Sequence, residues 1–328
     1  MNKRGFIFTF ISVVLVSVLM LAFLINYTSR TRTDIERTNT EVETMNSFVK
    51  SLNNDYLPRA LQTSGNQAIL ALLHHMSVSD NYMSAEDGGA TAQNFIRNAI
   101  VDGDYEWDLG VGGGNPAPKL ELMQIEGVSY NLSSVLNEVV NLANFTGIIF
   151  YFDEINKNDV TIFQDNPWYV NFTMSMTYTV TDKNQDISWS YTDKEIKASI
   201  PIIYFRDPIY MVAIAQDANP EDGINITINK TTYDIPSEIV PHVENTNFLA
   251  CNSAPSFLDR MQGNVGISSQ QGIESMVNIK DSQQSSVDYQ YIFGGNYELR
   301  QIGSSGYFID LSHSECYNLG EGGEGNEG

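Results

Sequence analysis

The histidines and cysteines have the greatest capacity for chemistry in this chain, and their spacing indicates no shared site. His74 and His75 are adjacent, and neighbouring side chains on a helix point about 100° apart, so the pair is poorly placed to hold one metal ion. A zinc site could also draw on residues far apart in the sequence, but their spacing matches no familiar ligand pattern. Those residues are His242, Cys251, His313, Glu315 and Cys316.

The sequence also lacks a catalytic arrangement. Asp310, Ser312 and His313 are the residue types of a nucleophilic triad, but no nucleophile elbow or oxyanion loop accompanies them. The glycines at 112–114 are followed by Asn115 and Pro116 instead of the Lys and Ser or Thr of a phosphate-binding loop. We therefore predict that the chain is not an enzyme and needs no cofactor.

Acidic side chains alternate between residues 102 and 108 in the manner of ligands for a hard cation. The glycine and the terminal glutamate that an EF-hand loop requires are missing. The stretch is therefore either a weak Ca²⁺ site or a solvated acidic loop. The candidate ligands are Asp102, Asp104, Glu106 and Asp108.

The chain has two cysteines, Cys251 and Cys316, both in its last quarter. Outside the cytoplasm an even pair is most simply one disulfide. That bridge would close a loop of about 65 residues and contribute roughly 4 kcal/mol to stability. Two buried free thiols are the alternative.

The chain is strongly acidic, with 40 acidic against 18 basic residues and a net charge of −22 over 328 residues. Such a surface repels the phosphate backbone of nucleic acids, so we exclude nucleic acid as a partner. The charge favours solubility at a crowded or salty cell surface. A surface that collects cations is the alternative.

Twenty residues from Phe6 to Ile25 form an apolar run that is interrupted only by Thr9, Ser12 and Ser17. As a helix this run is about 30 Å long, which matches the hydrocarbon thickness of a bilayer. A cleaved secretory signal would be shorter and would end in small residues. We predict a single-pass anchor that contacts membrane lipid through Phe6 to Ile25.

The orientation of this anchor is not set by its flanking charges, because basic residues lie on both sides of it. The acidic C-terminal body and its glycosylation sequons favour a cytoplasmic N-terminus and an extracytoplasmic body at the cell membrane. The candidate N-glycosylation sites are Asn144, Asn171 and Asn225.

An apolar stripe continues at helical spacing beyond the membrane, until Pro58 stops or kinks the helix. This rod either packs on the body of the chain, called the head below, or associates with other rods in a bundle or filament. The stripe consists of Ile35, Val42, Met45, Val49, Leu52 and Tyr56.

The head begins with helices and continues with strands. A second helix is expected at 61–76, an irregular loop or insert at 79–118, and a helix capped by Asn131 or Ser133 that runs to about Ala143. Residues 169–181 alternate between apolar and polar, which predicts a strand with one buried and one hydroxyl-rich face. After a turn at 182–186, residues 188–203 return to complete an antiparallel hairpin. Further strands are predicted at 147–152, 160–164, 224–229, 289–293, 297–302 and 307–310, with a short helix at 256–262.

These elements predict an α+β fold: a long N-terminal anchoring helix, then an antiparallel sheet or sandwich with a few short helices. The expected divisions are 1–27, the anchor; 28–78, the stalk and second helix; 79–125, an irregular insert; 126–240, an α+β domain with the long hairpin; 241–319, a β-rich part; and 320–328, a disordered tail rich in Gly and Glu.

Lys3-Arg4-Gly5-Phe6, followed by the apolar run, resembles the class III signal of type IV prepilins. The resemblance covers the first tenth of the chain. It implies that a peptidase cuts between Gly5 and Phe6 on the cytoplasmic side and that the helix enters a filament core. The bacterial pattern has a glutamate five residues after the cut, where this chain has Phe10. That departure suits a minor pilin or a pilin-like anchor that is never polymerised.

Several segments of the head resemble a widespread archaeal family of single-pass surface proteins, often with pilin-like N-termini and largely uncharacterised. The resemblance spans most of the chain and implies no catalytic residues. It rests on Asp165 to Asn171, Phe205 to Tyr210, Ala254 to Arg260 with Gly263-Asn264, Gly272 to Ser275, and Ser286 to Tyr289.

Together these patterns predict a membrane-anchored, pilin-like surface protein with a structural or adhesive role. Its partners would be itself or other pilin-like subunits, through the rod. The alternative is a tethered module that is not assembled into a filament and that binds or senses a ligand or glycan through the outer face of its sheet.

Overall fold

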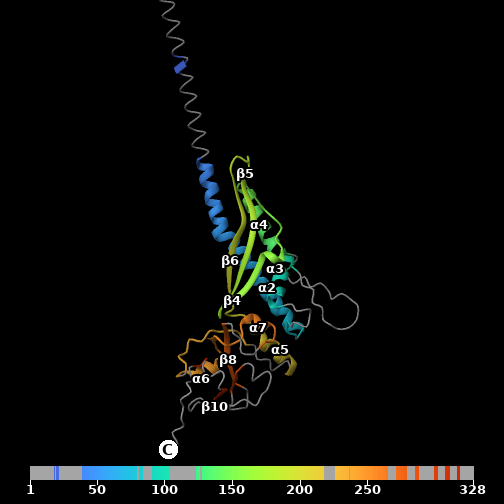
Figure 1. The fold of residues 1–328 in the computed structure, drawn as a ribbon, viewed down its shortest axis with the longest axis vertical. Helices are drawn as coiled ribbons and strands as arrows, with labels where there is room; N and C mark the ends of the chain where they lie inside the picture. Colours follow the sequence, from blue (N-terminus) through green and yellow to red (C-terminus); the bar gives the residue numbers. More distant parts are fainter. Residues whose placement is uncertain are drawn as a thin grey trace, which may run out of the picture.

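The computed structural model has an α+β fold with antiparallel sheets and several helices, which confirms the predicted class at that level (Figure 1). The predicted anchor, Phe6 to Ile25, lies outside the described residues apart from Val18, Met20 and Leu21, which are helical. In the part of the chain that is described, no helix has both the length and the apolar character needed to cross a membrane. The described residues are 18, 20, 21, 39–79, 81–83, 91–103, 123–125, 128–217, 226–235, 237–264, 271–278, 285–287, 299–301, 307–310, 316 and 317.

One continuous helix takes the place of the two that the sequence predicts. Residues 39–51 are α-helical, η1 (Leu52–Tyr56) is a π-helical turn, and α2 (Leu57–Ser79) follows without a break. The backbone N–H that follows the π-turn donates to the carbonyl five residues back. Pro58 has no N–H, and its ring clashes with the carbonyl four residues earlier in a regular α-helix, so the wider turn accommodates it. Of the two outcomes expected at Pro58, a stop or a kink, the stop is therefore wrong.

The predicted apolar stripe packs against the head of the same chain. Met45, Val49 and Leu52 are buried in the main apolar core, and Val42 and Tyr56 are half-buried. Over this stretch the structure therefore shows packing on the chain's own head. Ile35 lies outside the described residues. The predicted helix at 61–76 is confirmed within α2, whose buried apolar residues are Leu57, Ala60, Leu61, Ala68, Ile69, Leu72, Leu73 and Met76.

The main sheet is built around one long strand, β5 (Tyr169–Asp182), as the alternating pattern predicts. β6 (Ser188–Pro201) pairs antiparallel along one edge of β5. Along the other edge, β3 (Ile148–Phe152) pairs with the end of β5 and β4 (Val160–Asn166) with its beginning, also antiparallel. The strands predicted at 147–152 and 160–164 are thus confirmed, as is the hairpin.

Helices cover one face of this sheet, the inner face. Val170 and every second residue of β5 after it point inward and are buried, and α2 and α4 (Leu132–Phe145) pack there. Asn131 caps α4 as predicted, because its side chain accepts the N–H of Ser134 at 2.9 Å. Gly65 lets α2 come close to the sheet, since a Cβ at this position would lie 2.9 Å from Ile200 Cδ1.

A β-bulge in β6 explains why its apolar pattern changes phase. Tyr178 pairs with Tyr191 and Met176 with Lys194, so two residues of β6 lie opposite Thr177. One of them, Asp193, has a positive φ of 49°, and its N–H donates to Thr177 Oγ1 at 3.2 Å. The extra residue moves the inward positions from odd numbers before the bulge to even numbers after it.

The C-terminal part forms smaller sheets around a second apolar core, at the end of the head opposite the start of the blue helix (Figure 1). β7 (Phe248–Cys251), β8 (Gly272–Asn278) and β9 (Ser285–Val287) form an antiparallel sheet that the sequence analysis missed. β10 (Leu299–Gln301) and β11 (Phe308–Asp310) pair as a hairpin within the strands predicted at 297–302 and 307–310. The short helix α6 (Ile239–Glu244) completes this part.

A buried ion pair connects the two parts of the head. Arg260 lies in α7 (Phe257–Met261), the helix predicted at 256–262, and Asp207 immediately precedes α5 (Pro208–Asp217). Arg260 Nη2 is 2.6 Å and Nε 2.9 Å from Asp207 Oδ2, and neither side chain is exposed. Asp207 Oδ1 also accepts the N–H of Ile209, and Arg260 Nη1 donates to the carbonyl of Ile273. Because loss of one partner would leave a buried charge unpaired, this arrangement fixes α5, α7 and β8 relative to one another.

Two other predictions need correction. The stretch 79–118, expected to be irregular, contains the amphipathic helix α3 (Ala92–Asp102), whose Phe95, Ile96 and Ile100 are buried. The predicted strand at 224–229 is wrong for its described residues, because there Thr227 makes only an isolated bridge with Arg206. The strand predicted at 289–293 lies outside the described residues. The remaining described elements are β1 (Gln124–Ile125), β2 (Val128–Ser129) and η2 (Lys157–Asp159).

The register of β5 predicts opposite outcomes for two adjacent substitutions. Phe172 is 1% exposed, so Phe172→Asp should lower the free energy of unfolding by more than about 3 kcal/mol, because it buries a charge. Thr173 faces outward opposite Lys197, so Thr173→Asp should cost less than about 1 kcal/mol. Urea unfolding of both variants measures the difference, and equal losses would contradict the register.

Candidate functional site

The outer face of the main sheet carries mostly hydroxyl groups, although the chain is strongly acidic. Outside the bulge, the charged outward positions of β3 to β6 are Asp165, Glu195 and Lys197, and Lys197 Nζ lies 3.0 Å from Glu195 Oε2. In a protein of net charge −22 this is a nearly neutral surface. The charge of this face therefore gives little preference for a cationic ligand over a neutral one. The outward residues of β5 after Asn171 are Thr173, Ser175, Thr177, Thr179 and Thr181.

A groove of about 510 Å³ opens on this face near the turn between β4 and β5. Two aromatic side chains line it, Phe163 from β4 and Tyr169 from β5, and each is 40% exposed. Its volume lies within the roughly 300–1,000 Å³ of typical ligand sites. The polar residues that line the groove come from three neighbouring strands: Asp165, Asn166, Asn171, Thr173, Lys197 and Ser199.

A chain of hydrogen bonds crosses the floor of the groove. Ser199 Oγ donates to Asn171 Oδ1 at 2.6 Å, and Asn171 Nδ2 donates to Asp165 Oδ1 at 2.5 Å. The amide in the middle is thus held by β6 on one side and β4 on the other. This geometry provides oriented donors and acceptors beside two aromatic surfaces, which suits binding; it does not present a nucleophile with a general base.

One of the two functional hypotheses from the sequence places a ligand on the outer face of the sheet. Among the groove residues, however, only Asn171 was a candidate, and it was a candidate for glycosylation. The available signal was the pattern of outward positions. Phe163 and Tyr169 replace the Ser and Thr that occupy most other outward positions, and the printed sequence shows this once the strands are aligned.

A second groove, of about 350 Å³, lies between α2 and the chain before α5. His74 and Tyr204 line it, and Tyr204 is 79% exposed with a positive φ of 75°. The adjacent His75 has its pKa lowered by burial and by the neighbouring His74. No other histidine, and no cysteine or acidic residue, lines this groove among the described residues, so it offers no metal site.

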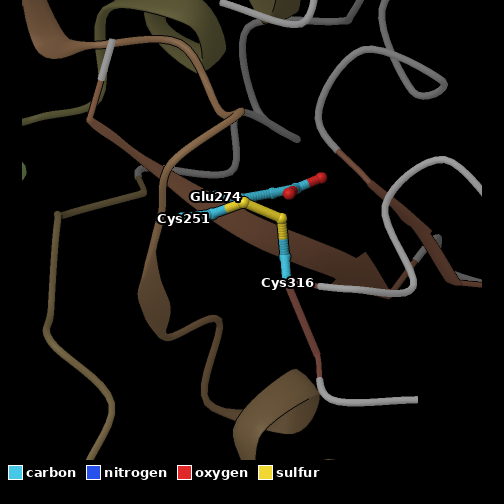
Figure 2. Close-up of side chains that lie close together, drawn as sticks. All are labelled: Cys251, Glu274 and Cys316. Carbon is cyan, nitrogen blue, oxygen red and sulfur yellow. A yellow bond between two sulfur atoms is a disulfide. The ribbon is translucent and has the colours of Figure 1, made fainter. Parts of the chain in front are cut away.

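Cys251 and Cys316 form a disulfide, the pairing expected from the sequence (Figure 2). The buried carboxylate of Glu274 on β8 lies beside the two sulfurs. Ligand atoms of these three residues all lie within 4.8 Å of one another, the one such group found among the described residues. Metal coordination requires thiolates, which a disulfide does not provide, so the bridge serves as a covalent tie between β7 and the C-terminal segment.

His242 of α6 is a fully buried histidine close to this disulfide. Its Nδ1 lies 3.0 Å from Thr231 Oγ1, and its ring meets the edge of the buried Tyr317 ring, next to Cys316. Burial lowers the pKa of His242 from 6.5 to about 4. His242, Cys251 and Cys316 thus lie in one core but do not form a metal site. His313 and Glu315, the other members of the hypothetical zinc set, lie outside the described residues.

The remaining candidates are separated in space or lie outside the described residues. Asp102 ends α3, and its Oδ2 lies 2.6 Å from Lys157 Nζ, so this carboxylate is engaged in an ion pair. Asn144 is exposed on the last turn of α4, whereas the amide of Asn171 is held in the groove. The calcium, processing and glycosylation hypotheses stay predictions. Their residues outside the described part are Asp104, Glu106, Asp108, Gly5, Phe6 and Asn225.

Protein-family models, curated proteins and solved structures were all compared with the chain, and none matches it.

The buried His242 predicts a loss of stability in mild acid. Its folded pKa lies below the unfolded value, so it contributes stability above about pH 6.5 that is lost as the pH falls towards 4. The wild-type chain should lose up to about 3 kcal/mol more than His242→Gln between about pH 7 and pH 4. Urea unfolding across this pH range measures the free energy of unfolding of the wild type and of His242→Gln. If the two free energies change in parallel with pH, the effect is ruled out.

Proposed function

We propose that the chain is a membrane-anchored, extracytoplasmic, pilin-like surface protein that displays an adhesive or ligand-binding head. The observation that carries the proposal is the helix from residue 39 to Ser79, which lies along the inner face of an antiparallel sheet. In Figure 1 the blue part of this helix begins at the end of the head opposite the C-terminal part. An anchor that precedes this helix would leave the outer face and the C-terminal part accessible.

The packing of the helix limits how the chain can associate with itself or with pilin-like subunits. Met45, Val49 and Leu52 are already buried in the head, so they are not available to a helical bundle. Contacts between rods would have to use residues before this stretch, as the prepilin resemblance implies for Phe6 to Ile25. In this proposal, the helix from residue 39 to Ser79 supports the head.

The outer face favours an adhesive or binding role over a purely structural one. A binding surface uses partly exposed aromatic residues beside an oriented amide, and the groove provides both. A tethered binding or sensing module that is never polymerised is the second candidate, and the same groove supports it. We propose no catalytic role for either form.

The mature N-terminus tests the proposed anchoring. The chain should require detergent for extraction from membranes, and mass spectrometry should find a mature form that begins at Phe6, because the prepilin-type cut follows Gly5. Gly5→Val should keep Met1 and still remain in the membrane. An intact Met1 in the native chain would favour the tethered module over the pilin-like form. Recovery of the chain in the soluble cytosolic fraction would contradict the proposal.

A further inference from the structure

We propose that the groove on the outer face binds a neutral carbohydrate, with a sugar ring stacked on Tyr169 or Phe163. The inference deepens the proposed surface role and rests on it for its biological setting, but the binding itself is a property of the purified chain. Phe163 and Tyr169 are each 40% exposed at strand positions that face water. Asn171 is next to both: it pairs with Phe163 across the strands and is the next outward residue after Tyr169 on β5.

The polar groups of the groove are held in place before any ligand arrives. Asn171 is fixed between Ser199 and Asp165, and the exposed ammonium of Lys197 lies 3.0 Å from Glu195. A preformed site loses little conformational entropy on binding. Hydroxyl, amide, carboxylate and ammonium groups therefore surround the aromatic surfaces with alternating donors and acceptors, which complements the hydroxyl groups of a sugar.

The charge of the groove favours a neutral sugar over an acidic one. Asp165 is the carboxylate in the groove lining, and the charge of Lys197, the cation in that lining, is already compensated by the neighbouring Glu195 at 3.0 Å. A uronic or sialic acid would bring a further carboxylate to a chain of net charge −22. Nucleic acid is disfavoured by the same charge.

An extended peptide fits the groove less well than a sugar. Peptides that bind to sheets usually add a strand to an open edge, where unpaired backbone groups are available. The groove instead lies across β4, β5 and β6, and the backbone of β5 is paired on both sides there. The aromatic residues and polar side chains, not the backbone, are what the groove offers to a ligand.

The sequon at Asn171 provides a competing occupant. A glycan attached covalently to Asn171 Nδ2 would disturb its hydrogen bond to Asp165 and fill the groove. The described sequon at Asn144 is exposed on α4, far along the chain from the groove residues. The intact mass of peptides that contain Asn171 therefore separates a binding site from a modification site.

The experiment uses the full chain in detergent and a panel of neutral and acidic oligosaccharides at up to millimolar concentration, followed by calorimetry on any ligand found. Tyr169→Ser should weaken binding at least about tenfold, because it removes the stacking surface, and Phe163→Ser should also weaken it. Tyr151→Ser is the matched control: Tyr151 is 64% exposed on the outer side of β3 but does not line the groove. The affinity of the Tyr151→Ser variant for the ligand should stay within about twofold of the wild-type affinity.

Three outcomes would overturn the inference: no neutral carbohydrate binds, Tyr151→Ser weakens binding as much as Tyr169→Ser, or Asn171 carries a glycan in the native protein. Urea unfolding confirms that each variant is folded. The binding experiment does not depend on where the chain resides, so its failure would leave the proposed anchoring intact. Failure of the anchoring would equally leave the groove's affinity unchanged.

Discussion

Burial of one apolar stripe of the long helix against the sheet is the constraint on which the rest of the head depends. Met45, Val49 and Leu52 continue into the buried face of α2, so one helix packs along the inner face against β5 and β6, beside α4. Two polar contacts fix its placement: Tyr178 Oη donates to Asn53 Oδ1, and Gln62 Nε2 donates to the carbonyl of Ser199 on the edge strand. With the helix on one side, the other side of the sheet remains open to solvent and free to bind.

The ion pair between Asp207 and Arg260 has a comparable role between the main sheet and the C-terminal part. Further hydrogen bonds reinforce it: the Tyr210 and Ser275 hydroxyls lie 2.9 Å apart, and Gln164 Oε1 accepts the N–H of Phe257 at 2.9 Å. Four separate stretches of the chain therefore meet at this joint, through Gln164, through Asp207 and Tyr210, through Phe257 and Arg260, and through Ser275.

The sequence predicted the elements whose pattern is local. Strand β5 alternates strictly, Asn131 is a strong helix cap, and α2 has regular apolar spacing, so each could be recognised without tertiary information. Other elements depend on distant contacts. β8 buries the carboxylate of Glu274, which reads as an exposed residue in the sequence. Whether Pro58 ends a helix or is absorbed by a π-turn depends on the packing on both sides of it. The groove could not be predicted from the sequence, because its residues come from three strands whose register the sequence does not determine.

Thiol labelling tests the central packing of the helix most directly. The chain's two cysteines form a disulfide, so a cysteine introduced by Met45→Cys or Thr44→Cys is the one thiol available. In dilute monomeric chain, Thr44→Cys should react rapidly, because Thr44 is exposed. Met45→Cys should react at least about a hundredfold more slowly, because Met45 is buried against the chain's own head. Equal rates in the monomer, with protection only after self-association, would show that the stripe is an interface between subunits and would contradict the account.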